Sequence, residues 1–177
     1  EDKDEPRRVQ MSRHLLSQNG KQMSISDLVE YLQSKKTDLK GAWIGENSSY
    51  ESEMCKELGF ACQKTRYWDC YFNGIYIEVK KGHSIWLDEV RYCEIFLGIN
   101  QQARTRTVTM FLIPSKDKAG IDTIRIVDTV RIIEFLGLNV GWARALLERE
   151  KQIKRGLNCQ HTMTQKDLRE IANYTIS

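Results

Sequence analysis

The residues best suited to chemistry are Asp69, Glu78 and Lys80, which fall within one short segment rich in aromatic and β-branched residues. Two carboxylates that face each other across paired strands repel and destabilise a sheet. A hard divalent cation held by oxygen ligands would offset this repulsion. A lysine beside the pair adds a group that can stabilise negative charge. The three side chains therefore predict a metal site, provided that the fold brings them together.

A β-hairpin would bring these side chains together. An Asn-Gly dipeptide at 73–74 lies between two strand-like runs, and this dipeptide favours a two-residue type I′ turn. Pairing Phe72 with Ile75 places the two carboxylates opposite each other, and the lysine falls on the same face because side chains alternate along a strand. The alternative is an edge hairpin whose outer face merely carries charge. The predicted apolar face consists of Trp68, Cys70, Phe72, Ile75, Ile77 and Val79.

The hairpin resembles the catalytic motif of the PD-(D/E)xK phosphodiesterases, which have the restriction-endonuclease-like fold. Asp69 stands for the aspartate of the motif and Glu78-Val79-Lys80 for its E-x-K triplet, whereas Trp68 replaces the proline. The resemblance implies that Asp69, Glu78 and the carbonyl of Val79 hold Mg²⁺, for which Mn²⁺ can substitute. It also implies a restriction-type or structure-specific endonuclease that hydrolyses phosphodiester bonds in DNA, with Lys80 assisting the attacking water.

Two other functions stay open at this point. One is an endoribonuclease of the same fold. The other is a module that binds nucleic acid or another partner without cutting it, although such a module has no reason to retain two carboxylates that repel. A palindromic duplex substrate would call for a two-fold homodimer.

A helix predicted over 50–58, ended by Gly59, offers a further ligand. This part of the chain is similar to the opening helix and first strand of archaeal Holliday-junction resolvases, where a helix glutamate completes the metal site. That resemblance implies Glu51, which borders the apolar stripe of the helix, with Glu53 and Glu46 as alternatives. Here Glu51 lies about one turn nearer to the glycine than in those resolvases.

The order of the predicted elements indicates a mixed α/β fold, and the resemblance narrows it to a restriction-endonuclease-like core. This core, assigned to 22–115, follows a polar N-terminal arm at 1–21 and is expected to have a mixed sheet flanked by helices. Its predicted elements are a helix at 24–35, the helix at 50–58, three antiparallel strands at 60–66 and in the hairpin, a helix at 87–97 that leaves Arg91 outside its apolar face, and a strand at 107–113.

Residues 116–177 are predicted to form a mainly helical extension packed on the core within a single domain. A strand is expected at 123–127, and helices at 130–136, at 140–155 and from Thr164 onward. Gly137 is the expected end of the first of these helices, and Asp167 pairs with Thr164 as a capping box.

Nucleic acid, with DNA favoured, is the partner that the resemblance implies. A formal net charge of +3 permits this partner without demanding it, because clustering of cations matters more than their sum. The candidate contacts are Lys64, Arg66, Lys81, His83, Arg104 and Arg106.

Cysteine usage and hydropathy bear on location. Five cysteines without a C-x-x-C pair fit free thiols in a reducing compartment. No apolar run approaches the roughly 20 residues of a membrane span, and the first residues lack the apolar region of a signal peptide. We therefore expect an intracellular protein, in the cytoplasm or nucleus, without a membrane partner.

Overall fold

The computed structural model describes residues 23–35, 50–100, 103, 107–117, 120–153 and 159–177. The expected N-terminal arm at 1–21 and three candidate site residues, Glu46, Arg104 and Arg106, lie outside these ranges. None of the helices within the ranges is long and apolar enough to cross a membrane.

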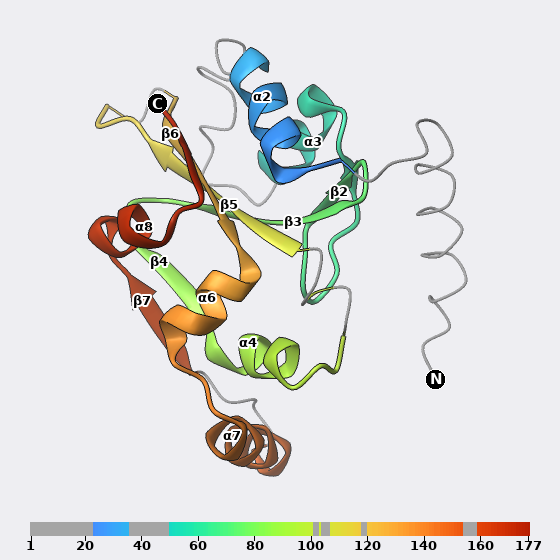
Figure 1. The fold of residues 1–177 in the computed structure, drawn as a ribbon, viewed down its shortest axis with the longest axis vertical. Helices are drawn as coiled ribbons and strands as arrows, with labels where there is room; N and C mark the ends of the chain where they lie inside the picture. Colours follow the sequence, from blue (N-terminus) through green and yellow to red (C-terminus); the bar gives the residue numbers. More distant parts are fainter. Residues whose placement is uncertain (1–22, 36–49, 101–102, 104–106, 118–119, 154–158) are drawn as a thin grey trace.

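A six-stranded mixed sheet forms the centre of the fold (Figure 1). Strands β3 and β5 pair in parallel and the other neighbours pair antiparallel, which agrees with the predicted α/β class. In spatial order the strands are β1 (Ala61–Cys62), β2 (Cys70–Phe72), β3 (Ile75–Lys81), β5 (Thr107–Pro114), β6 (Ile121–Asp128) and β8 (Tyr174–Ile176).

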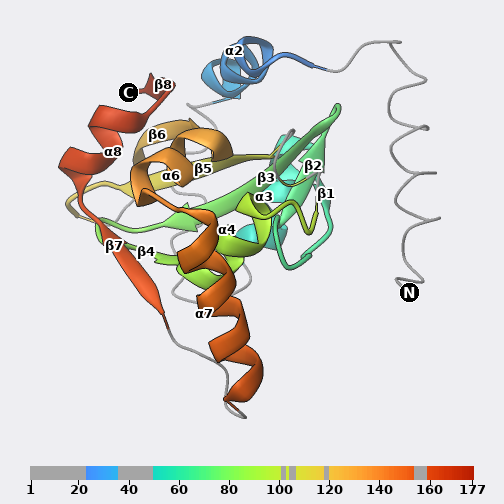
Figure 2. The ribbon, with the colours of Figure 1, turned by 60° about the horizontal axis from the view of Figure 1, so that its bottom comes forward.

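Helices cover both faces of this sheet, as expected for the class (Figures 1 and 2). Apolar side chains of α2 (Ile25–Lys35) and α3 (Tyr50–Leu58) pack in one core cluster with those of β3, β5 and β6. On the other face, α4 (Glu89–Phe96), α6 (Thr129–Leu136) and α8 (Gln165–Ile171) share a second cluster with Tyr76 and Phe111. Helix α7 (Val140–Gln152) packs against α4 in a third, smaller cluster.

Local signals predict the helix ends well. The Ser24 hydroxyl accepts the backbone N–H of Asp27 at 3.1 Å, so it caps α2 as expected. Thr164 and Asp167 form the predicted capping box of α8. Gly59 and Gly137 adopt φ angles of 68° and 61°, the left-handed conformation that ends α3 and α6.

The predicted hairpin register is confirmed for β2 and β3. Phe72 pairs with Ile75, Tyr71 with Tyr76 and Cys70 with Ile77, and Asn73 and Gly74 have positive φ angles of 45° and 91°. The predicted apolar face is confirmed from residue 70 onward, since Cys70, Ile75, Ile77 and Val79 are buried and Phe72 packs against their cluster.

Before Cys70 the predicted register is wrong. The Asp69 N–H donates to the carbonyl of Ile77 at 2.9 Å, a shift of one residue, so Asp69 does not pair with Glu78 as a strand partner. The shift also moves Trp68 to the other face of the sheet, where the centroid of its ring lies 4.3 Å from the ring centroid of Tyr76. The first strand is shorter than expected, because residues 63–69 form a hydrogen-bonded loop.

The helix predicted at 87–97 begins two residues later than expected. Leu87 and Asp88 belong instead to β4 (Ile85–Asp88), which pairs antiparallel with β7 (Gln160–Met163) in a separate two-stranded sheet.

The extension at 116–177 contains strands beyond the one expected at 123–127. Its helices are present, but β6 and β8 join the main sheet, so the extension and the core share one sheet.

Candidate active site

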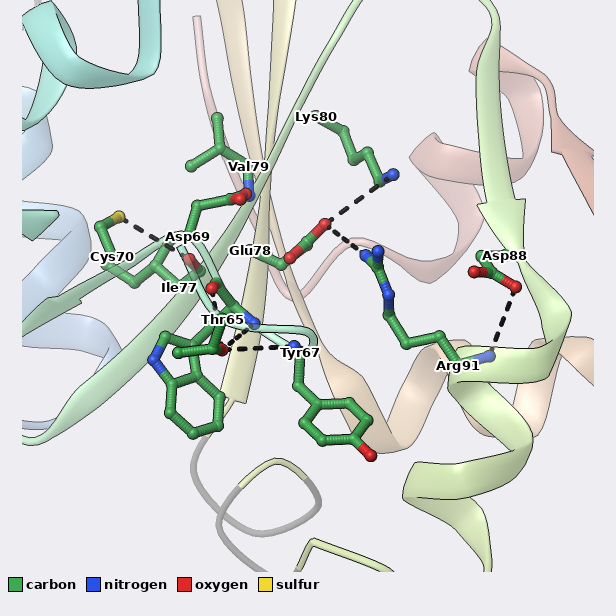
Figure 3. Close-up of polar contacts among 11 residues, drawn as sticks. Thr65, Tyr67, Asp69, Cys70, Ile77, Glu78, Val79, Lys80, Asp88 and Arg91 are labelled. Carbon is green, nitrogen blue, oxygen red and sulfur yellow. Dashed lines mark hydrogen bonds and ion pairs between the residues drawn. The ribbon is translucent and has the colours of Figure 1, made fainter. Parts of the chain in front are cut away.

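Asp69 is held at the end of a tightly bonded loop. Its carbonyl accepts the backbone N–H groups of Gln63 and Lys64 at 2.9 and 3.0 Å, and the Trp68 indole donates to the Gln63 side chain at 2.7 Å. Its carboxylate accepts the backbone N–H of Val79 at 2.7 Å. The side chain therefore replaces a missing bond of the strand ladder and is fixed beside the middle of β3 (Figure 3).

Among the residues that the structure describes, Glu78 is the one charged residue that is buried, with 6% of its surface exposed. It lies on β3 and points to the face that α4 covers. Its Oε1 accepts a hydrogen bond from Arg91 Nη1 at 2.9 Å, and Lys80 Nζ lies 3.8 Å from the same oxygen. Figure 3 shows both cations directed at this carboxylate from different elements.

The electrostatics of the two acids reflect their burial. Burial raises the pKa of Glu78 to about 7, and the negative charge of Asp69 adds to this, whereas Arg91 and Lys80 oppose it. Burial also raises the pKa of Asp69, which the Val79 N–H opposes. The protein therefore compensates the negative charge of this pair only in part, and an added cation would stabilise both ionised forms.

Of the two described alternatives for a third acid, Glu51 is the one coupled to the site. The charge of Glu51, on α3, raises the pKa of Glu78 further. It is half-buried, whereas Glu53 is exposed to solvent.

Asp69 and Glu78 fit a hard divalent cation by the chemistry of their oxygen donors. Mg²⁺ in proteins often takes only one or two carboxylates, and its remaining ligands are water and substrate phosphate. Within the described ranges, no three histidine, cysteine or acidic side chains are grouped closely enough to hold a metal by themselves. The fit therefore rests on two carboxylates, one of which also binds Arg91.

The described candidates for nucleic-acid contact differ in their surroundings. The exposed Lys64, with a φ of 43°, lowers the pKa of Asp69 and so lies near the acids. Arg66 instead forms a two-pronged ion pair with Glu94, at 2.6 and 2.8 Å. Lys81 is half-buried at the end of β3, and the exposed His83 accepts a bond from the Gln165 side chain at its carbonyl.

Arg91 is the site residue that the sequence prediction missed. A helix beginning at Leu87 placed it outside the apolar face, but α4 begins at Glu89, after the N-cap Asp88. Arg91 is therefore in the first turn, where the helix dipole disfavours a cation. An arginine three residues after an N-cap aspartate was the available signal, because a cation in the first helical turn calls for a nearby anion.

Comparison with known proteins adds no family assignment. The chain matches no protein-family model, no curated protein and no solved structure.

Proposed function

We propose that the protein is a Mg²⁺-dependent endonuclease that hydrolyses phosphodiester bonds, with DNA as the favoured substrate. The observation that carries this proposal is that Asp69 is bonded to β3, the strand that carries Glu78 and Lys80, with Glu78 buried and its pKa raised to about 7. Retaining two repelling acids inside a protein costs stability, and a site that needs their charge accounts for this cost.

The order and pairing of the elements support a restriction-endonuclease-like core. Helix α3 precedes three antiparallel strands, and β3 then pairs in parallel with β5, which follows α4. The pair β4 and β7 is an addition to the order that the resemblance implies.

In the proposed reaction, Asp69 and Glu78 hold the cation, and Glu51 and the Val79 carbonyl are further candidate ligands. When bound, the cation acts as a Lewis acid on the phosphate and lowers the pKa of a bound water. The Val79 N–H keeps the Asp69 carboxylate in place. Lys80, with 26% of its side chain exposed, orients the water or stabilises the developing negative charge.

One observation favours a rival function. Arg91 and Lys80 both approach Glu78, so the cluster can also be a permanent ion-pair network in a module that binds nucleic acid without cutting it. An endoribonuclease of the same fold would use the same residues as the proposed enzyme. Cleavage assays separate these functions.

The test is incubation with plasmid, linear duplex, branched DNA and structured RNA, in Mg²⁺, Mn²⁺ or EDTA. We expect metal-dependent cleavage of a DNA substrate, reduced by about 100-fold or more in Asp69→Asn and in Lys80→Ala. The amide oxygen introduced by Asp69→Asn can still accept the Val79 N–H, so this variant removes charge while retaining the local hydrogen bond.

The matched controls are Asp122→Asn and Lys116→Ala, which change exposed residues on β6 and in the turn before it. Both should cleave at the rate of the unchanged protein. Full activity in either site variant would refute the assignment of catalytic residues. Cleavage of RNA alone would instead favour the ribonuclease.

A further inference from the structure

Arg91 and Lys80 converge on one atom. The Arg91 guanidinium contacts Oε1 of Glu78 at 2.9 Å, and the Lys80 ammonium lies 3.8 Å from the same oxygen. Arg91 comes from α4 and Lys80 from β3, so each cation is carried by a different element. Of the two, Arg91 makes the shorter contact and donates a charge-assisted hydrogen bond.

The position of Arg91 in α4 is unfavourable by itself. Asp88 Oδ1 accepts the backbone N–H groups of Val90 and Arg91 at 3.1 and 3.4 Å, which places Arg91 in the first turn. A cation there is disfavoured by the helix dipole. Its Nε is also buried without a hydrogen-bond partner among the described residues, which adds a desolvation cost. Contact with Glu78 is what accounts for the arginine at this position.

We propose that Arg91 is an internal counter-ion that competes with the divalent cation for Glu78. This rests on the proposed function, because that function supplies the cation. In the metal-free protein the guanidinium pairs with the carboxylate, and a bound cation would displace it. By occupying Glu78, Arg91 lowers the affinity of the site for the cation.

Removal of Arg91 distinguishes competition from a supporting role, because the two roles predict opposite changes in the affinity for the cation. If Arg91 only held Glu78 in the correct orientation, its removal would weaken cation binding. If it competes for Glu78, its removal leaves the carboxylate available and strengthens binding, because a unit charge in contact with the ligand oxygen is lost.

The experiment is calorimetric titration of Mn²⁺ into the full chain without nucleic acid, at pH 8. We expect Arg91→Met to bind Mn²⁺ about tenfold more tightly than the unchanged protein. Arg91→Gln should show the same tightening, and it keeps an amide donor for Glu78 if the methionine variant fails to fold. Glu78→Gln should bind Mn²⁺ more weakly.

Arg66→Met is the matched control. It also removes an arginine from an ion pair with a glutamate, but its partner is Glu94 of α4 rather than Glu78. Its affinity for Mn²⁺ should stay within about twofold of the unchanged protein, since additivity holds for sites without shared partners.

Equal or weaker Mn²⁺ binding by the folded Arg91 variants would overturn the inference. Tightening without cleavage of any nucleic acid would support it while refuting the nuclease function. Failure of the unchanged protein and of both Arg91 variants to bind Mn²⁺ would overturn the inference and the cation site together.

Discussion

At the scale of single residues, the two acids are held in different ways. The Asp69 carboxylate accepts a backbone N–H of β3, so the main chain fixes its position. The Glu78 carboxylate is held by Arg91 and Lys80, which are side chains that can move. The main chain therefore fixes one carboxylate and movable side chains hold the other, which is what the proposed exchange of Arg91 for a cation at Glu78 requires.

The pKa of Glu78 predicts how stability depends on pH. The carboxyl titrates near 4.5 when unperturbed and has a pKa of about 7 in the folded protein, so the folded state holds more protons between these values. The free energy of unfolding should therefore fall as pH rises from about 4.5 to about 7, by on the order of 2–3 kcal/mol.

Urea unfolding at pH 5 and pH 8 in EDTA measures this effect. In Glu78→Gln most of the decline should vanish, because the variant lacks the carboxyl whose pKa is raised to about 7. The control Glu53→Gln changes an exposed acid on α3 and should behave like the unchanged protein. Equal declines in the Glu78 variant and in the unchanged protein would contradict the prediction.

At the scale of elements, three local structures meet at the site. Strand β3 carries Glu78 and Lys80, the loop at 63–69 holds Asp69 against this strand, and α4 supplies Arg91. The N-terminus of α4 is held by the Asp88 side chain and by the pairing of β4 with β7. Rigid elements on both sides therefore set the separation of Arg91 from Glu78.

Loss of the α4 cap should lower stability. In Asp88→Ala the N–H groups of Val90 and Arg91 lose their acceptor, and the positive end of the helix loses a nearby anion. We expect a decrease of about 1 kcal/mol in the free energy of unfolding, measured by urea denaturation. The control Asp122→Ala changes an exposed aspartate within β6, and an equal effect in both variants would argue against the cap.

At the scale of the whole molecule, segments far apart in the sequence complete one sheet. Strand β8 pairs with β6, and Ile176 lies in the core cluster with side chains of α2 and α3. The last strand therefore supports the face of the sheet opposite to α4, on which the helix carrying Glu51 also packs.

Truncating this side chain should destabilise the entire fold. Ile176→Ala removes an almost completely buried side chain, and we expect a loss of about 2–3 kcal/mol in the free energy of unfolding. The exposed neighbour Ser177 provides the control, because Ser177→Ala should change stability by less than about 0.5 kcal/mol. A similar small effect for Ile176 would show that β8 can detach without cost to the core.

The sequence by itself determined the features that depend on neighbouring residues. The Asn-Gly turn, the register of the hairpin from Cys70 to Phe72, the caps at Ser24 and Thr164 and the glycine ends of α3 and α6 all follow from backbone preferences within a few positions. The alternation of side chains along β3, which places Glu78 and Lys80 on the same face, follows from local geometry in the same way.

Tertiary structure decided what depends on contacts between distant segments. The loop before Asp69 shifts the register and turns Trp68 to the opposite core, and the pairing of β4 with β7 delays α4 so that Arg91 reaches Glu78. Burial under α4 raises the pKa of Glu78 to about 7. No local pattern specifies these outcomes, because each is the balance of packing and desolvation among residues that only the complete fold brings together.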